Sequence, residues 1–100
     1  MGKYAHIEKM ENIMVQQNEK LKEMNQLLDT LDTQQEEYRA LIAYYYSEQR
    51  SRDIDDDSHH LIPESMHRGV LSEDDIYDLI GEYRDTAIRM LEVAVRMIKE

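Results

Sequence analysis

The sequence predicts an all-α protein, and three observations support this prediction. Apolar side chains recur in alternating steps of three and four residues through both halves of the chain. The 100 residues include three glycines and one proline, so few positions demand a turn. Hydrophobic residues make up 41% and charged residues 34%, a balance typical of helices that bury one face and expose the other. At this length we expect a single helical domain over residues 1–100.

The first predicted element is one long amphipathic helix, from about residue 4 to about residue 50. Its apolar seam keeps the same phase over more than five heptads. The seam consists of Ile7, Met10, Met14, Gln17, Leu21, Met24, Leu28, Leu31, Gln35, Tyr38, Ile42 and Tyr45. An α-helix places positions with this spacing on one stripe. Ile13, Leu27 and Leu41 widen the stripe, which suits a multi-helix bundle better than a two-stranded coiled coil.

The second predicted element is an acidic, partly ordered connection over about residues 53–71. Nineteen residues is long for a link between two helices, and connections of this length inside a compact domain are usually functional. We expect residues 55–59 to be exposed. The apolar residues of the connection are expected to pack against the 38–46 end of the first helix: Leu61, Ile62, Val70 and Leu71.

The third predicted element is a helix over about residues 73–99. Its seam repeats the pattern of the first helix at Ile76, Ile80, Tyr83, Ala87, Met90, Ala94 and Met97. Ser72 is the predicted N-cap, with Asp75 three residues later. Acidic residues gather at the start of this helix and basic residues near its end, which complements the helix dipole.

The two helices are predicted to pack antiparallel as a hairpin that self-association completes. The first would span about 70 Å and the second about 40 Å, so the N-terminal seam would remain uncovered. A homodimer is the favoured remedy. The alternative is a monomeric three-helix bundle with a break near residues 29–33. The predicted interaction seam is Ile7, Met10, Met14, Leu21, Met24 and Leu28.

The acidic connection also contains potential metal ligands. The candidates are Asp53, Asp55, Asp57, Glu64, His59 and His60. The four carboxylates occupy positions 1, 3, 5 and 12 of an EF-hand frame. Ser58 stands where that frame needs glycine, and Pro63 where the exiting helix begins. The favoured interpretation is therefore a solvated acidic turn, with no metal and no cofactor.

The composition argues against several classes of function. The net charge of −10 argues against binding nucleic acid or an anionic membrane surface. The absence of cysteine excludes disulfides, thiolate nucleophiles and Cys-ligated metal centres. The chain has no Gly-rich phosphate loop and no nucleophile motif, so we expect it not to be an enzyme. No apolar run approaches a membrane span, and a cytoplasmic location is expected.

The leading hypothesis is a non-enzymatic protein that works through protein–protein interaction, including self-association, with an unknown protein partner. A second hypothesis is an acidic inhibitor or nucleic-acid mimic, because residues 53–85 hold eleven acidic and two basic side chains. A weak metal-responsive helical module is the third. Candidates for a recognition surface are Tyr44, Tyr46, Arg68 and Gly69. The tyrosines are alternatively the broad end of the apolar core.

Several short strings also carry a resemblance to a known family. They are Tyr44-Tyr45, Asp53, Pro63, Arg68-Gly69-Val70-Leu71-Ser72-Glu73-Asp74 and Ile76-Tyr77-Asp78-Leu79. In these the chain resembles the bacterial domain-of-unknown-function family 4298, a group of short helical proteins. The resemblance extends over nearly the whole chain, and its most specific part is the string at residues 69–74. It implies a bacterial, helical, cytosolic protein and implies no activity.

Overall fold

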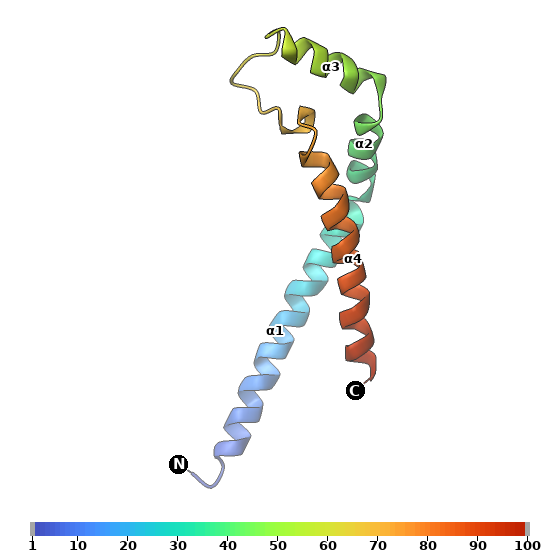
Figure 1. The fold of residues 1–100 in the computed structure, drawn as a ribbon. Coiled ribbons are helices and arrows are strands. Elements are labelled where there is room, and N and C mark those ends of the chain that lie inside the picture. Colours follow the sequence, from blue (N-terminus) through green and yellow to red (C-terminus); the bar gives the residue numbers. More distant parts are fainter. Residues whose placement is uncertain (1, 100) are drawn as a thin grey trace. The chain divides into compact units, whose positions relative to one another are not determined.

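The computed structural model describes residues 2–99, and it is all-α as predicted (Figure 1). The helices are α1 (Ala5–Thr33), α2 (Gln35–Tyr45), α3 (Glu48–Ser58) and α4 (Asp75–Lys99), with a short 3₁₀ turn η1 (Gly69–Leu71) before α4. The chain divides into two units, residues 1–39 and residues 40–100. The single domain and the antiparallel packing of the two long helices stay predictions.

The predicted continuous helix over residues 4–50 is wrong in its bounds, and the first interruption is mild. Gln34 separates α1 from α2 with φ −87° and ψ 2°. Its N–H still donates to the Thr30 carbonyl at 3.0 Å. The hydroxyl groups of Thr30 and Thr33 bond to carbonyls three or four residues back, which competes with the regular ladder. The interruption thus follows directly after residues 29–33, where the alternative prediction placed a break.

The second interruption, at Tyr46 and Ser47, is a true corner. Ser47 is extended, with φ −87° and ψ 157°, so the helical path stops there. Its hydroxyl oxygen accepts from the Arg50 N–H at 3.2 Å, which caps the start of α3. The same hydroxyl donates to the Tyr44 carbonyl at 2.6 Å. One serine therefore ends α2 and begins α3, and in Figure 1 α3 runs across the end of α2.

The predicted loop conformation of residues 53–58 is also wrong, because these residues form the second half of α3. The helix ends in a Schellman motif. His60 adopts φ 59°, its N–H donates to the Asp57 carbonyl at 3.1 Å, and the Leu61 N–H donates to the Asp56 carbonyl at 3.0 Å. Residues 61–68 then run without regular structure to η1. Leu61 and Val70 are exposed, contrary to the predicted packing, while Ile62 and Leu71 are half-buried.

The start of α4 confirms the predicted N-cap. The Ser72 hydroxyl oxygen accepts from the Asp75 N–H at 3.1 Å, although the helix itself begins at Asp75 rather than 73. One turn later lies Ile76, which exposes 2% of its surface and is the one buried apolar residue among those described. η1 contacts both α3 and α4. The apolar core within residues 40–100 is therefore minimal.

His60 provides a test of the helix end. A non-glycine residue in the left-handed region costs about 1–2 kcal/mol, and glycine avoids this cost but has more freedom in the unfolded chain. We expect His60→Gly to raise the free energy of unfolding by up to about 1 kcal/mol and His60→Val to lower it. His67→Gly, in a segment without positive φ, is the matched control and should lose stability. Urea denaturation measures all three, and equal midpoints for His60→Gly and His67→Gly would contradict the assignment.

Candidate functional site

The candidate site within residues 40–100 is a set of polar contacts that ties the α2–α3 corner to the return segment before α4. We call it the polar clasp, and its members are Tyr44, Gln49, Arg50, Asp53, Asp57 and Arg68. Its first part spans the corner itself. The Tyr44 hydroxyl donates to Asp53 Oδ2 at 2.6 Å, and the Gln49 amide donates to Asp53 Oδ1 at 2.8 Å. Both carboxylate oxygens of Asp53 are thereby occupied.

Arg50 makes the longest connection in the polar clasp. Its Nε donates to the Val70 carbonyl at 3.0 Å and its Nη2 to the Ser72 carbonyl at 3.0 Å. The guanidinium also lies 4.7 Å from the centroid of the Tyr45 ring, a cation–π distance. The planar fork of arginine can reach two carbonyls and an aromatic face together, whereas lysine cannot. Arg50 therefore joins α2, α3 and the N-terminus of α4.

The third part of the polar clasp is an ion pair. Arg68 Nη1 lies 2.6 Å from Asp57 Oδ1, and both side chains are partly shielded from water. This pair holds the residue before η1 against the last turn of α3. In η1 itself, a Cβ on Gly69 would lie 2.9 Å from Asp75 Oδ2, so the glycine leaves room for the first carboxylate of α4.

Two pKa values respond to the corner contact. Hydrogen bonds from Tyr44 and then from Gln49 lower the pKa of Asp53. The same Tyr44–Asp53 bond raises the pKa of Tyr44 above 10.0. Both effects favour an ionised Asp53 beside a neutral phenol. The contact therefore contributes stability between the two pKa values and loses it beyond either one.

The candidate metal ligands do not converge. Residues 53–57 are helical, so they cannot wrap around an ion as an EF-hand loop does. Asp53 and Asp57 bond to protein partners within the polar clasp, and His59 Nδ1 lies 2.8 Å from the backbone oxygen of Asp55. Glu64 and His60 are exposed beyond the end of α3. Across residues 2–99, no group of three or more His, Cys, Asp or Glu side chains is placed to hold a metal.

The four recognition-surface candidates fall into different settings. Tyr44 and Arg68 belong to the polar clasp, and Gly69 opens η1. Tyr46 is 77% exposed and meets the Tyr45 ring edge-on, with centroids 4.9 Å apart. The polar clasp was not predicted from the sequence, because Gln49 and Arg50 carry no signal of their long-range partners. The Ser47 N-cap was the one local signal that could have placed the corner.

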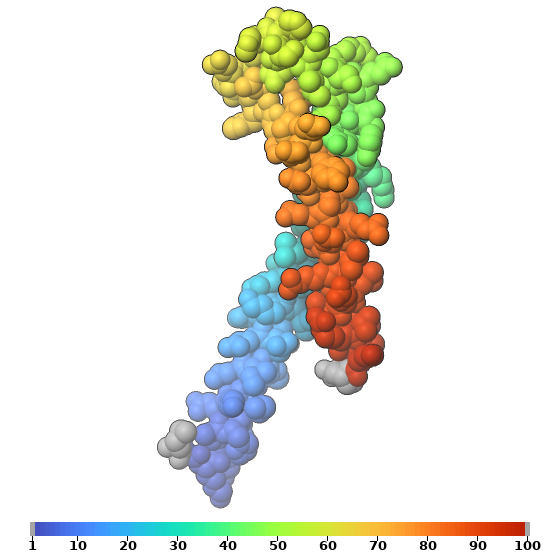
Figure 2. Space-filling model, in the orientation of Figure 1, coloured from blue at the N-terminus to red at the C-terminus, as the bar shows by residue number. Residues whose placement is uncertain are grey.

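The predicted interaction seam lies along α1, which has no buried residue. Its six residues expose between 42% and 55% of their surface: Ile7, Met10, Met14, Leu21, Met24 and Leu28. Ile13 and Leu27, which widen the seam, are also exposed. Figure 2 shows the blue-to-cyan part of the chain, α1, as a slender rod of side chains. This helix therefore presents a long apolar stripe.

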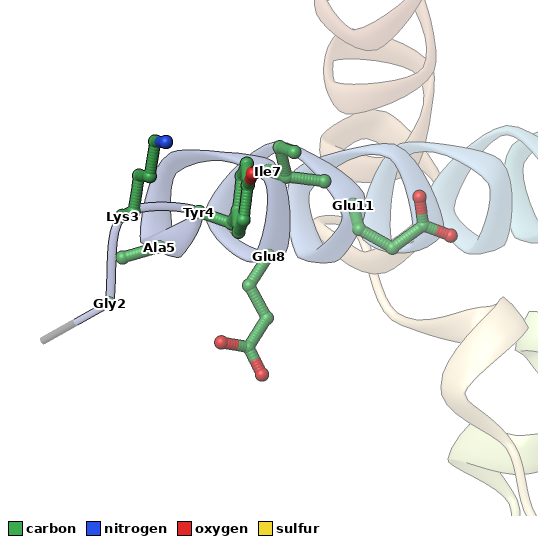
Figure 3. A pocket seen from close by; sticks show the side chains of 7 residues that line it. All are labelled: Gly2, Lys3, Tyr4, Ala5, Ile7, Glu8 and Glu11. Carbon is green, nitrogen blue, oxygen red and sulfur yellow. The ribbon is translucent and has the colours of Figure 1, made fainter.

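A shallow, open depression lies at the N-terminal end of α1 (Figure 3). Its lining is Gly2, Lys3, Tyr4, Ala5, Ile7, Glu8 and Glu11. Lys3 Nζ lies 5.7 Å from the Tyr4 ring centroid, while the Glu8 and Glu11 carboxylates point away from each other into solvent. The lining comes from one helix end and has no convergent polar groups, so it lacks the features of a ligand site.

The corner contact gives a pH-dependent test. We expect Tyr44→Phe to lower the free energy of unfolding most at neutral pH. The deficit should shrink as pH falls through the lowered pKa of Asp53, and again as pH rises through the raised pKa of Tyr44. Exposed Tyr46→Phe is the control and should follow the wild-type pH profile. Denaturant titrations from acid to alkaline pH measure the difference, and a deficit independent of pH would contradict the linkage.

Arg50 gives a second test of the polar clasp. Arg50→Lys keeps the charge but loses the fork, so we expect the free energy of unfolding to fall by about 1–3 kcal/mol. Arg52→Lys is the matched control, because Arg52 is exposed and lies 3.7 Å from Glu48 on the same helix. Its effect should stay within about 0.5 kcal/mol. Equal effects of the two substitutions in urea denaturation would show that the Val70 and Ser72 carbonyl contacts contribute nothing.

Comparisons with known proteins give a family and no activity. No curated protein and no protein of solved structure matched the chain. No helix among the described residues is long and apolar enough to cross a membrane. A model of one protein family matches residues 7–93, which include α2, α3, η1 and the strings quoted above. The chain therefore belongs to the family described as a domain of unknown function, DUF4298.

Proposed function

We propose that the protein acts through protein–protein interaction, as a non-enzymatic helical module that self-associates along the seam of α1. The observation that carries this proposal is the exposure of the seam, between 42% and 55% for each of its six residues. At about 1.5 Å per residue, the seam from Ile7 to Leu28 extends over about 32 Å of α1. Monomeric proteins rarely expose an apolar patch of such length.

The spacing of the seam favours a second copy of the chain as the partner. Three apolar positions per heptad occur where Ile13 and Leu27 precede seam residues. A stripe of this width is typical of bundles of several helices, which two copies would supply. Gln17 interrupts the seam and would fix the register at some cost in stability. Beyond the shared family, we propose a bacterial protein that works in the cytoplasm.

The structure gives less support to the second hypothesis, an acidic inhibitor or nucleic-acid mimic. Asp53 and Asp57 bond within the polar clasp and are less available to a basic partner. The salt dependence of association separates the two hypotheses. Association through the seam should depend weakly on ionic strength, whereas an acidic mimic should lose affinity steeply as salt increases. The metal-responsive module rests on candidate ligands that do not converge, and calcium or zinc titration tests it directly.

Substitution on opposite faces of α1 tests the proposal. Met14→Glu places a charge inside the paired seam, so we expect the dissociation constant to rise by about tenfold or more. Asn12→Glu adds the same charge two residues away, on the opposite face, and should leave association within about twofold. Sedimentation equilibrium measures both, with circular dichroism to verify helicity. A wild-type monomer mass at concentrations on the order of tens of micromolar, or equal effects of the two substitutions, would overturn the proposal.

A further inference from the structure

The apolar surface of α4 widens along the helix. At about 100° per residue, Ile76, Leu79, Ile80 and Tyr83 span an arc of about 100°, which the exposed Tyr77 widens to about 160°. Between residues 87 and 98 the apolar side chains span about 220°, and the polar ones, with Lys99, fall within about 80°. A helix that packs on one face typically buries an apolar stripe about 100° wide or somewhat wider. The second half of α4 therefore presents apolar surface on two sides.

The additional surface is a regular stripe, which we call the distal stripe. Its members are Ile88, Leu91, Val95 and Ile98. Their spacing of three, four and three residues is that of a helix-pairing seam. They expose 41%, 68%, 51% and 83% of their surface, so the most exposed large aliphatic side chain among residues 2–99 belongs to this stripe. This surface is separate from the seam of α1.

We infer that the distal stripe pairs antiparallel with the same stripe of a second copy. This inference rests on the proposed self-association and adds a second contact to it. In the antiparallel register Ile88 meets the partner's Ile98, and Leu91 meets the partner's Val95. Each layer then combines two aliphatic side chains. Ala87 and Ala94 lie along one flank, where their small side chains permit close approach of the helices.

Charge complementarity selects this orientation. The first half of α4 is acidic, because it contains four acidic residues (Asp75, Asp78, Glu82 and Asp85) and one basic residue, Arg84. The second half is basic, with Arg89, Arg96 and Lys99 against Glu92. In the antiparallel register Lys99 flanks the partner's Asp85, and symmetry forms this pair twice. A parallel register would place Ala87 beside the partner's Glu92 and Ala94 beside the partner's Lys99, with no opposite charges in contact.

The antiparallel register also brings one pair of like charges together, and this pair gives the register a further testable feature. Glu92 lies near the two-fold axis, beside the partner's Glu92, and like charges there oppose association. Glu92→Gln should therefore tighten self-association, most clearly at low salt. Two attractive pairs and one repulsive pair at known positions give a signature that apolar contact alone would not produce.

Disulfide trapping tests the orientation, and the absence of native cysteine makes it clean. Leu91→Cys is mixed with Val95→Cys carrying a mass tag, and the mixture is gently oxidised. The antiparallel register predicts mainly the mixed disulfide, whereas each variant alone should cross-link poorly. Arg89→Cys, on the polar side of the helix, should cross-link poorly with every partner. Cross-linking of Leu91→Cys chiefly with itself would overturn the antiparallel register.

A charge exchange tests the flanking pairs without disturbing the apolar layers. Asp85→Lys and Lys99→Asp should each raise the dissociation constant by about two- to tenfold, and the double variant should return it to within about twofold of wild type. Failure of the double variant to recover, together with no mixed disulfide, would overturn the contact on α4 while self-association along α1 stands. A monomeric wild-type chain would overturn both.

Discussion

The arrangement of residues 40–100 depends on the contact of Arg50 with the two backbone carbonyls before α4. Ile76 is the one buried apolar side chain described, so burial alone supplies little of the free energy that orders this unit. Arg50 connects a helix to carbonyls 20 and 22 residues further along the chain. Arg50 reaches these carbonyls only because α3 lies across the end of α2. The corner at Ser47 and the guanidinium contacts of Arg50 therefore depend on each other.

The distribution of polar and apolar contacts explains why we propose association for a protein of this composition. Hydrophobic residues make up 41% of the chain, yet most large aliphatic side chains of α1 and of the second half of α4 are exposed. A folded chain gains stability chiefly by removing such surface from water. The surface not removed within the chain remains available to a partner, and the heptad spacing on both stripes is the spacing of surfaces that pair with a helix.

The sequence predicted features that depend on neighbouring residues. The Ser72 cap and the helical periodicity of both long segments are local, and the structure confirms the cap, the all-α class and the approximate extent of α4. The corner at Ser47 was missed because the heptad phase continues to Tyr45 and no glycine or proline follows before residue 50. The helical conformation of residues 53–58 was missed because aspartates were interpreted as a turn. Its stabilisation comes from Tyr44 and Arg68, which no local pattern connects to these aspartates.

The two halves of α4 therefore have different physical tasks. The first turn, with Ser72 and Ile76, is where the polar clasp fixes the helix to η1 and α3. Leu91, within the distal stripe, lies fifteen residues beyond Ile76, or about 22 Å along the axis. Energetic coupling between two sites this far apart is weak unless an element that switches between two conformations connects them. A regular helix has only one conformation, so it does not transmit such coupling. Loss of Arg50 contacts should thus lower the stability of residues 40–100 while leaving pairing at the distal stripe intact. In the proposed pairing, the acidic half of one α4 extends beside the basic half of another, so the polarity that favours the helix internally would also orient it toward its partner.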